Sequence, residues 1–404
     1  MSSFGFTFLS KKALGQAEQS MFGGTAGVRD EVGFLIIHQR YADHFFPGTS
    51  VLHTRLRYAL LIPWIFETLR QKRPVPRDFA QAYVDMEHDI TGRLKFDGEA
   101  GEKDGGIGGD VYPKPISQPP AYVYWTALSK WGLIGLRPDG RPWSRAEMAD
   151  LLVASRTRAL LDDDGKPLEG VPWPIVGLPD PPSDWSGAGK LSLAMPKDER
   201  RFLSGKLKAV RSPEDHSRPS LLSRLVDRPI ADATYCWDKS IVALAGDEAP
   251  MLARAGQAAA LSAIGRAVYA AQVETIKTVR DKRSPTTIHR DHLPATIASW
   301  GKKAAALNLD VFYDEVGNLP GPVSKVISET HEWVRKGSHD PMQLLETYAR
   351  AERFRKQDRT RLSDNQFGID RRLEWQADKH GKAEPLHYRW GNIKRLLSDL
   401  TGNA

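Results

Sequence analysis

The chain has 404 residues, of which 41% are hydrophobic and 26% are charged, and its net charge is +7. This composition is ordinary for a globular protein, and 11 Trp residues exclude a disordered chain. The basic balance favours an anionic partner, with nucleic acid ahead of an acidic membrane. Cys236 is the only cysteine, which excludes an intramolecular disulfide and a Cys-rich zinc site.

The sequence shows no sign of secretion or membrane insertion. The N-terminal residues lack the basic and apolar regions of a signal peptide. The longest apolar stretch, Tyr58–Phe66, is interrupted by Pro63 and is far shorter than the ~20 residues that cross a bilayer. We therefore expect a cytoplasmic protein without a membrane partner, in which the Cys236 thiol is buried and reduced.

The spacing of apolar residues predicts helices along most of the chain and no strand-rich region. A turn at Phe46–Ser50 supplies two N-cap residues, so the first long helix is expected at Val51–Gln71, bent at Pro63. Asp340 is placed to cap a later helix that begins with Pro341. The other expected helices lie at 77–94, 122–133, 145–155, 197–210, 220–228, 248–281, 321–336, 341–356 and 389–400.

These elements predict a mainly α, multi-helix globular protein with long Pro/Gly-rich connecting loops and room for two subdomains. Residues 97–120 are rich in Gly and Pro and are expected to form a surface loop. A second such segment surrounds Trp173 and Trp185, whose rings are expected to hold it against the body. We expect an N-terminal helical domain at 1–160, a connector at 161–195 and a C-terminal helical domain at 196–404.

Arg55 and Arg57 are the most informative residues of the N-terminal half. On the expected helix, Arg55 falls beside the apolar face, where a guanidinium is costly unless it is paired. One interpretation is that both arginines bind carboxylates, with the nearest candidates at Asp30, Glu31 and Asp43. The other is that they converge on a phosphate near the turn before the helix. Only the second interpretation predicts that Arg57→Ala weakens nucleic-acid binding without lowering the melting temperature.

The same region resembles a bacterial family of unknown function. The resemblance is carried by Phe46–Ser50, Thr54–Tyr58 and Ile62–Trp64 near the N-terminus, and by Tyr388–Trp390 near the C-terminus. Genes of that family often lie beside antiviral-defence or DNA-modification genes and helicases. The resemblance therefore implies a bacterial cytoplasmic protein, and it assigns no catalytic residue.

The C-terminal region is basic and aromatic. From Pro341 to Ala404 there are 13 Lys or Arg residues against nine Asp or Glu residues. Basic residues that alternate with aromatic ones suit a surface that follows phosphates and stacks bases. The candidate nucleic-acid-binding residues of the whole chain are Arg55, Arg57, Arg350, Arg353, Arg355, Lys356, Arg389, Trp390, Lys394 and Arg395.

The alternative for this region is a solvated helix face. Glu346 and Arg350, and then Glu352 and Lys356, have the i,i+4 spacing of surface ion pairs. Under this interpretation Trp375 and Trp390 belong to the core and do not stack on bases.

Searches for catalytic motifs give no strong candidate. Phosphate-binding loops, nucleophile elbows and His-Glu-x-x-His pairs are absent. His289 and His292 have metal-compatible spacing but lack further ligands, so we expect no metal and no cofactor. Asp162–Lys166 has the residue types of a magnesium-dependent nuclease, but its setting predicts an exposed turn.

Our leading hypothesis is a non-catalytic subunit that binds nucleic acid, DNA in the first instance, or scaffolds a bacterial antiviral-defence or DNA-processing complex. A helicase or another defence protein would be its partner. The first alternative is a nuclease whose site is unrecognised, with Asp163 or Asp291 as the residues to test. The second is a protein-interaction subunit without affinity for DNA.

Overall fold

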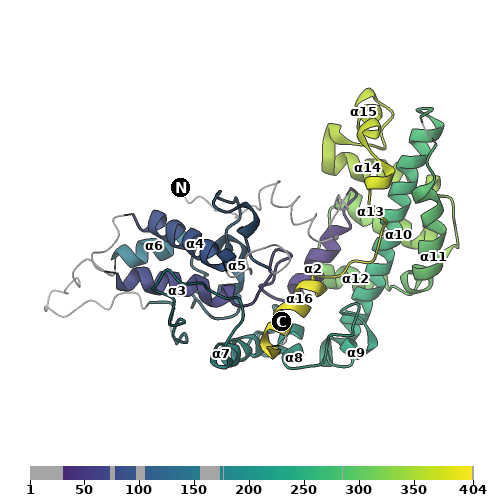
Figure 1. Ribbon diagram of the computed structural model, residues 1–404. Helices are drawn as coiled ribbons and strands as arrows, with labels where there is room; N and C mark the ends of the chain where they lie inside the picture. The colour runs from purple at the N-terminus through teal and green to yellow at the C-terminus, as the bar shows by residue number, and fades with distance from the viewer. Residues whose placement is uncertain are drawn as a thin grey trace. The chain divides into compact units, whose positions relative to one another are not determined.

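The computed structural model describes residues 31–72, 78–96, 105–154, 173–175, 177–283 and 285–402. Over these ranges it contains fifteen α-helices, α2 to α16, and several short 3-10 helices (Figure 1). The extended pairing found in the described residues is a single isolated bridge between Arg211 and Pro219. The prediction of a mainly α fold is confirmed.

The chain divides into two compact units. Unit 1 consists of Met1–Ala42 and Asp232–Trp390, and unit 2 of Asp43–Ala231 and Gly391–Ala404. The units therefore change over near residues 42, 231 and 390, and the connector expected at 161–195 falls inside unit 2. Trp185 holds its segment in unit 2, because its indole N–H donates to the Thr68 hydroxyl at 2.7 Å and its ring contacts Trp64.

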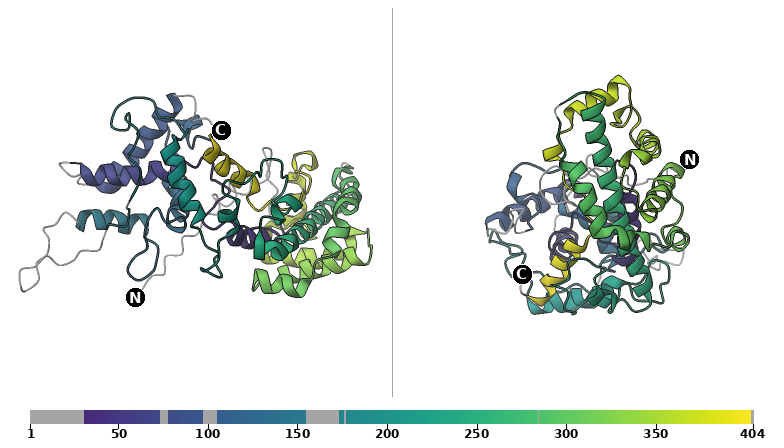
Figure 2. Two further views of the ribbon diagram at one scale, coloured as in Figure 1. Left: turned by 90° about the horizontal axis from the view of Figure 1, so that it is seen from below. Right: turned by 90° about the vertical axis from the view of Figure 1, so that its right-hand side faces the viewer.

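Unit 1 is built around α10 (Ala249–Val279), a helix of 31 residues that is buried along most of its length. Helix α11 (Ile288–Ala305) runs alongside it, as Figure 2 shows. On α10, Gly265 faces the ring of Phe34, which precedes α2, at a distance that leaves no room for a Cβ atom. The other α-helices of unit 1 are α2 (Leu35–Phe45, which reaches the boundary with unit 2), α9 (Lys239–Val242), α12 (Leu309–Val316), α13 (Gly321–Arg335), α14 (Leu345–Lys356) and α15 (Gln366–Glu374).

Unit 2 has α3 (Tyr58–Gln71) at its centre, and all residues from Tyr58 to Phe66 are buried. Helices α4 and α5 pack against α3. The α-helices of unit 2 besides α3 are α4 (Phe79–Phe96), α5 (Pro120–Lys130), α6 (Arg145–Ala154), α7 (Lys197–Lys208), α8 (Leu221–Leu225) and α16 (Trp390–Thr401).

The expected start of the first long helix is wrong. Helix α3 begins at Tyr58 and not at Val51, because side chains from elsewhere hold the preceding backbone in a non-helical conformation. The N–H groups of Thr54 and Arg55 donate to the Tyr124 hydroxyl at 2.9 and 3.1 Å. The N–H of Leu56 donates to a carboxylate oxygen of Asp399 at 2.7 Å.

Two other local predictions, the Asp340 cap and the burial of Cys236, are confirmed. The Asp340 carboxylate accepts a hydrogen bond from the Met342 N–H at 2.9 Å, and Pro341 follows it, although the first turn is a 3-10 helix, η4 (Pro341–Leu344). Cys236 is fully buried, and burial raises the pKa of its thiol. Among the described residues, no helix combines the length and apolar character that crossing a membrane requires.

Candidate nucleic-acid interface

Arg55 and Arg57 bind carboxylates inside unit 2. The Arg55 Nε lies 2.9 Å from Asp399 Oδ1, and the Asp399 side chain is almost fully buried. Arg57 binds Glu199 through two bonds of 2.5 and 2.8 Å and also donates to the Ser192 carbonyl. The carboxylate interpretation is thus the one that the structure shows, with partners other than the Asp30, Glu31 and Asp43 named from the sequence.

These contacts make Arg55 a residue of the fold. Arg55→Ala is expected to lower the free energy of unfolding by about 2 kcal/mol, because Asp399 loses its cation but keeps the bond from the Leu56 N–H. Urea denaturation measures the loss. Oligonucleotide affinity should stay unchanged at a temperature where the variant is folded, and a drop in affinity with unchanged stability would contradict this assignment.

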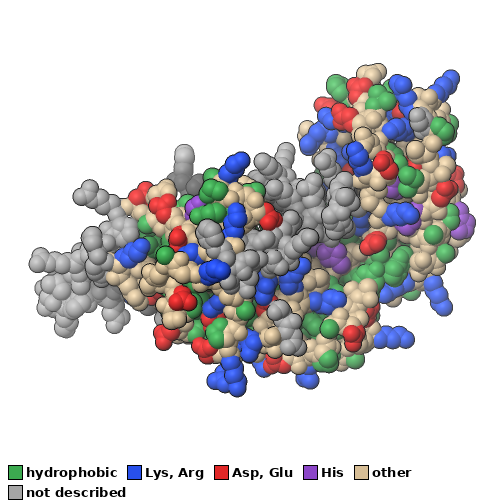
Figure 3. Space-filling view, viewed as in Figure 1, with side chains coloured by type: hydrophobic (Ala, Val, Ile, Leu, Met, Phe, Trp, Pro, Cys, Tyr) green, Lys and Arg blue, Asp and Glu red, His purple; other side chains and the backbone are tan. Residues whose placement is uncertain are grey.

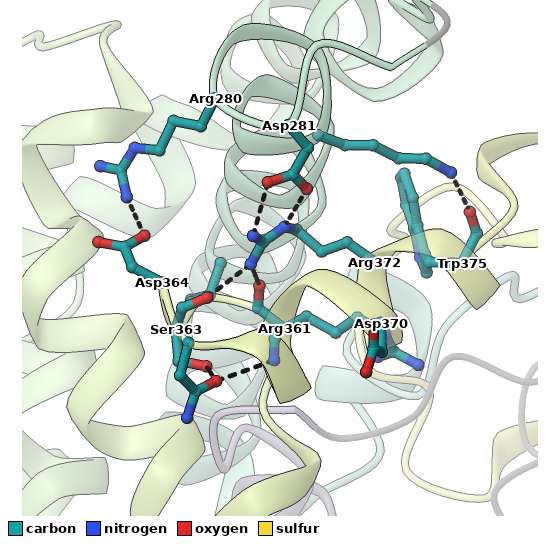
Figure 4. Close-up of polar contacts among 12 residues, drawn as sticks. Arg280, Asp281, Arg361, Ser363, Asp364, Asp370, Arg372 and Trp375 are labelled. Atoms are coloured by element: carbon teal, nitrogen blue, oxygen red, sulfur yellow. Dashed lines mark hydrogen bonds and ion pairs between the residues drawn. The ribbon is translucent and has the colours of Figure 1, made fainter.

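A buried ion pair that the sequence did not predict holds α15 to α10. Arg372, which is 1% exposed, binds both Asp281 carboxylate oxygens, at 2.7 and 2.8 Å (Figure 4). Its third nitrogen donates to the carbonyls of Arg361 and Ser363 at 2.5 and 2.7 Å. Because the guanidinium binds four acceptors, residues 361–375 have a fixed position at the end of α10.

Exposed phenylalanines and arginines lie on α14, η5 and α15, in the part of unit 1 that contains this ion pair. Phe354 on α14 is 58% exposed and Phe367 on α15 is 60% exposed. The short helix η5 (Gln357–Arg359) contacts both α14 and α15. We call this set the arginine–phenylalanine surface, and it consists of Arg353, Phe354, Arg355, Arg359, Phe367 and Arg371.

The charge of this surface is mixed. Arg353, Arg359 and Arg371 are exposed, and Arg371 pairs with Glu374 at 2.7 Å. Figure 3 shows Lys and Arg side chains among hydrophobic and acidic ones where α14 and α15 lie. Exposed surface pairs of this kind are weak, so Arg371 can exchange Glu374 for a phosphate at little cost.

The two ion pairs predicted on α14 differ in outcome. Arg350 pairs with Glu346 at 2.7 Å on the surface, as predicted. The prediction of a pair between Glu352 and Lys356 is wrong, because Lys356 instead binds Glu31. The Glu352 carboxylate is fully buried and accepts bonds from the Tyr269 hydroxyl and two backbone N–H groups.

The remaining candidates at the C-terminus lie in different settings. Trp390 is buried and donates to the Ala233 carbonyl at 3.0 Å, so its ring has no free face for stacking. Lys394 is half-buried and Arg395 is exposed, both on α16 of unit 2. They therefore belong to a different unit from the arginine–phenylalanine surface.

Arg389 belongs to a buried group of basic side chains in unit 1. We call it the basic cluster: His38, Arg266, His387 and Arg389. The His38 and His387 rings meet edge to face with centroids 5.2 Å apart, and Arg266 donates to the Glu384 carbonyl at 3.0 Å. Arg389 has a left-handed backbone with φ 63°, a strained conformation that is common at functional sites.

The basic side chains of the cluster lower the pKa values of the histidines near them. Burial lowers the pKa of His38 well below its usual value, and His387, Arg389 and Arg266 lower it further. Neither His38 ring nitrogen has a hydrogen-bond partner among the described residues. Burial likewise lowers the pKa of His380 to about 3, with further contributions from His289, Arg361, Arg266 and Lys356. Arg266 thus acts on both histidines.

The residues considered for metal or nuclease chemistry do not form such a site in the described part of the chain. The Nε2 atom of His289 lies 3.0 Å from the Ala377 carbonyl oxygen, and that of His292 lies 3.4 Å from the Ala383 carbonyl oxygen. No group of three or more potential metal ligands gathers among these residues. Asp291 is exposed on α11, and Asp162–Lys166 lies outside the described residues.

The described chain is thus a two-unit helical protein with an arginine–phenylalanine surface on unit 1. Residues 16–239 match the DUF6361 family, a family of unknown function. Because the match spans more than half of the sequence, the chain belongs to this family, and the expectation of an uncharacterised family is confirmed. No curated protein and no solved structure matches the chain.

Proposed function

We propose that the chain is a nucleic-acid-binding subunit that holds single-stranded DNA or RNA on the arginine–phenylalanine surface. The observation that carries the proposal is the exposure of Phe354 between Arg353 and Arg355, with Phe367 on the neighbouring helix. Apolar rings of this size are normally buried, and an exposed ring beside guanidinium groups suits base stacking with phosphate contacts. Single strands are favoured over duplexes because their bases can unstack onto a side chain.

The fixed position of the surface supports this proposal. Arg372 and Asp281 hold the α15 region against α10, so Phe367 and Arg371 are carried by a rigid element. Preordered side chains lose less entropy on binding. The cellular role that we propose, a part of a bacterial antiviral-defence or DNA-processing complex with a helicase or similar partner, follows from the sequence resemblance.

The test is fluorescence anisotropy with a labelled single strand over a range of KCl concentrations. Phe354→Ala and Phe367→Ala are each expected to weaken binding about tenfold, since one stacked base contributes about 1–3 kcal/mol. Arg353→Gln combined with Arg359→Gln should reduce the slope of log affinity against log salt by about 1.4, about 0.7 for each lost phosphate contact.

Matched controls are Leu136→Ala and Lys190→Gln, which remove an exposed apolar and an exposed basic side chain of unit 2. Both should bind like the parent protein. If the parent gives a flat titration at low salt, the nucleic-acid function is wrong.

A protein-interaction subunit is the second candidate. Val279 and Leu373 are exposed on α10 and α15, the two helices that the Arg372–Asp281 pair joins, at 64% and 44%. Apolar side chains gathered on a surface indicate a protein partner as well as they indicate bases. A flat anisotropy titration together with capture of a defined partner by the parent, but not by Leu373→Asp, would favour this function.

A further inference from the structure

Unit 2 contains a cavity between α4 and the segment that precedes α5. Its volume is about 90 Å³. Most of its wall is apolar and is formed by Val84, Pro115, Ile116, Pro119 and Pro120. The polar part of the wall is small, and one carboxyl group, that of Glu87, belongs to it.

Glu87 is a buried residue with few polar contacts. It is 5% exposed, and its Oε1 accepts a hydrogen bond of 2.7 Å from the Ala121 N–H at the start of α5. No lysine or arginine of the described chain forms an ion pair with it, whereas the buried carboxylates of Glu199, Asp281 and Asp399 each bind an arginine. Glu352 is also buried without a cation, but it accepts hydrogen bonds from three donors, whereas among the described residues the Glu87 carboxyl accepts the one bond from Ala121. Glu87 therefore lacks the partners that a buried carboxylate normally has.

The pKa of the Glu87 carboxyl is consistent with a carboxylate that binds a cation. Burial raises its pKa to about 7, while the Ala121 N–H and the more distant Arg145 act in the opposite direction. The carboxyl is therefore about half ionised near neutral pH, and a bound cation would complete its ionisation.

The cavity limits the size and charge of what can enter. An apolar cavity of about 150 Å³ holds benzene, so this smaller cavity fits the end group of a ligand whose remainder contacts the rim. Lys114 is at the wall but is exposed, so solvent and salt screen the repulsion between its ammonium group and a bound cation. The rings of His88 and Tyr112, stacked 4.7 Å apart, add an aromatic surface next to the carboxyl group.

We propose that this cavity binds the cationic end of an organic ligand, an ammonium or amidinium group on an apolar stem, with the Glu87 carboxylate as its counter-ion. The stem packs against the proline and isoleucine side chains of the wall. The site lies within unit 2 and is independent of the nucleic-acid function proposed for unit 1.

Binding of such a cation is linked to loss of a proton from Glu87. The pKa of Glu87 is about 7, so below this pH the carboxyl is mostly protonated. Each further decrease of one pH unit should weaken cation binding about tenfold. Between pH 8 and pH 6 the affinity should therefore fall about tenfold, because the ionised fraction falls by that factor.

The probes are benzamidine and n-butylamine, with benzamide as the uncharged match to benzamidine, and binding to the full chain is measured by calorimetry. Both cations should bind at least tenfold more tightly than benzamide at pH 8. Glu87→Gln keeps an oxygen for the Ala121 N–H and removes the charge, so it should weaken both cations at least tenfold and abolish the pH dependence. Val84→Trp should block the opening; Val84 is 54% exposed, so this change leaves the core intact.

Several results would overturn the proposal. They are no binding of either cation to the parent chain, equal binding of benzamide and benzamidine, or unchanged cation binding in both Glu87→Gln and Val84→Trp. Oligonucleotide affinity should be the same in parent and variants, which separates a failure here from a failure of the nucleic-acid function.

Discussion

Replacing Arg372 with alanine is expected to lower the free energy of unfolding of unit 1 by about 3–5 kcal/mol. The guanidinium is 1% exposed and binds four oxygen atoms, two of them on the buried Asp281 carboxylate. Its loss leaves Asp281 without its cation and leaves the carbonyls of Arg361 and Ser363 without this donor. Removing one partner of a buried pair costs more than the net value of the pair.

Chemical denaturation followed by tryptophan fluorescence measures this effect, since Trp375 lies just after α15. Arg371→Ala is the matched control, because Arg371 is exposed and pairs on the surface with Glu374, so it should cost less than about 1 kcal/mol. A loss below about 1 kcal/mol for Arg372→Ala would show that the pair does not fix α15. Arg372→Ala should also weaken oligonucleotide binding if the placement of Phe367 depends on the Arg372–Asp281 pair.

Acidification from pH 7 to pH 5 is expected to destabilise unit 1, with about 2 kcal/mol of the loss coming from His380 and a further loss of the same sign from His38. His38 and His380 both have a pKa far below the usual 6.5 in the folded chain, for His380 about 3. Below pH 6.5 the unfolded chain takes up protons that the folded chain does not. The stabilisation is therefore complete above pH 6.5 and is lost progressively as the pH falls towards 3.

His380→Gln should remove about 2 kcal/mol of this pH dependence, which denaturation of the parent and the variant at several pH values measures. The stability of unit 2 requires a separate probe, because the contribution of Glu87 changes with pH in the opposite direction. Its pKa is raised from 4.5 to about 7, so its contribution is full below 4.5 and is lost as the pH rises through 7. Equal pH dependence in parent and variant would mean that His380 is protonated in the folded chain.

The sequence predicted the long helices well where apolar spacing is strong. Helix α10 was expected at 248–281 and occupies Ala249–Val279, and α13 agrees equally closely. Helix α11 was missed, because Pro294 lies inside it and its first turn is polar. Helix α15 was missed because it has nine residues and few apolar ones.

The candidate site was harder to predict, because its outcome depends on contacts between distant residues. Arg57 and Glu199 are 142 positions apart, and Arg55 and Asp399 are 344 apart, so local spacing could not reveal the pairing. Trp390 was a stacking candidate under one interpretation and a core residue under the other, and it is buried, while Phe354 was passed over and is exposed. Sequence patterns identify a basic aromatic region, but packing decides which rings face solvent.

The order in which the chain is synthesised has a consequence for how unit 2 can fold. This unit takes its last helix, α16, from residues that leave the ribosome more than 150 positions after Ala231. Until α16 emerges, the Leu56 N–H and the Arg55 guanidinium have no Asp399 to bind. Most of unit 2 is therefore synthesised before most of unit 1, yet unit 2 is the last to be completed. A nascent chain stalled before α16 should expose residues 54–56 to proteases and chaperones.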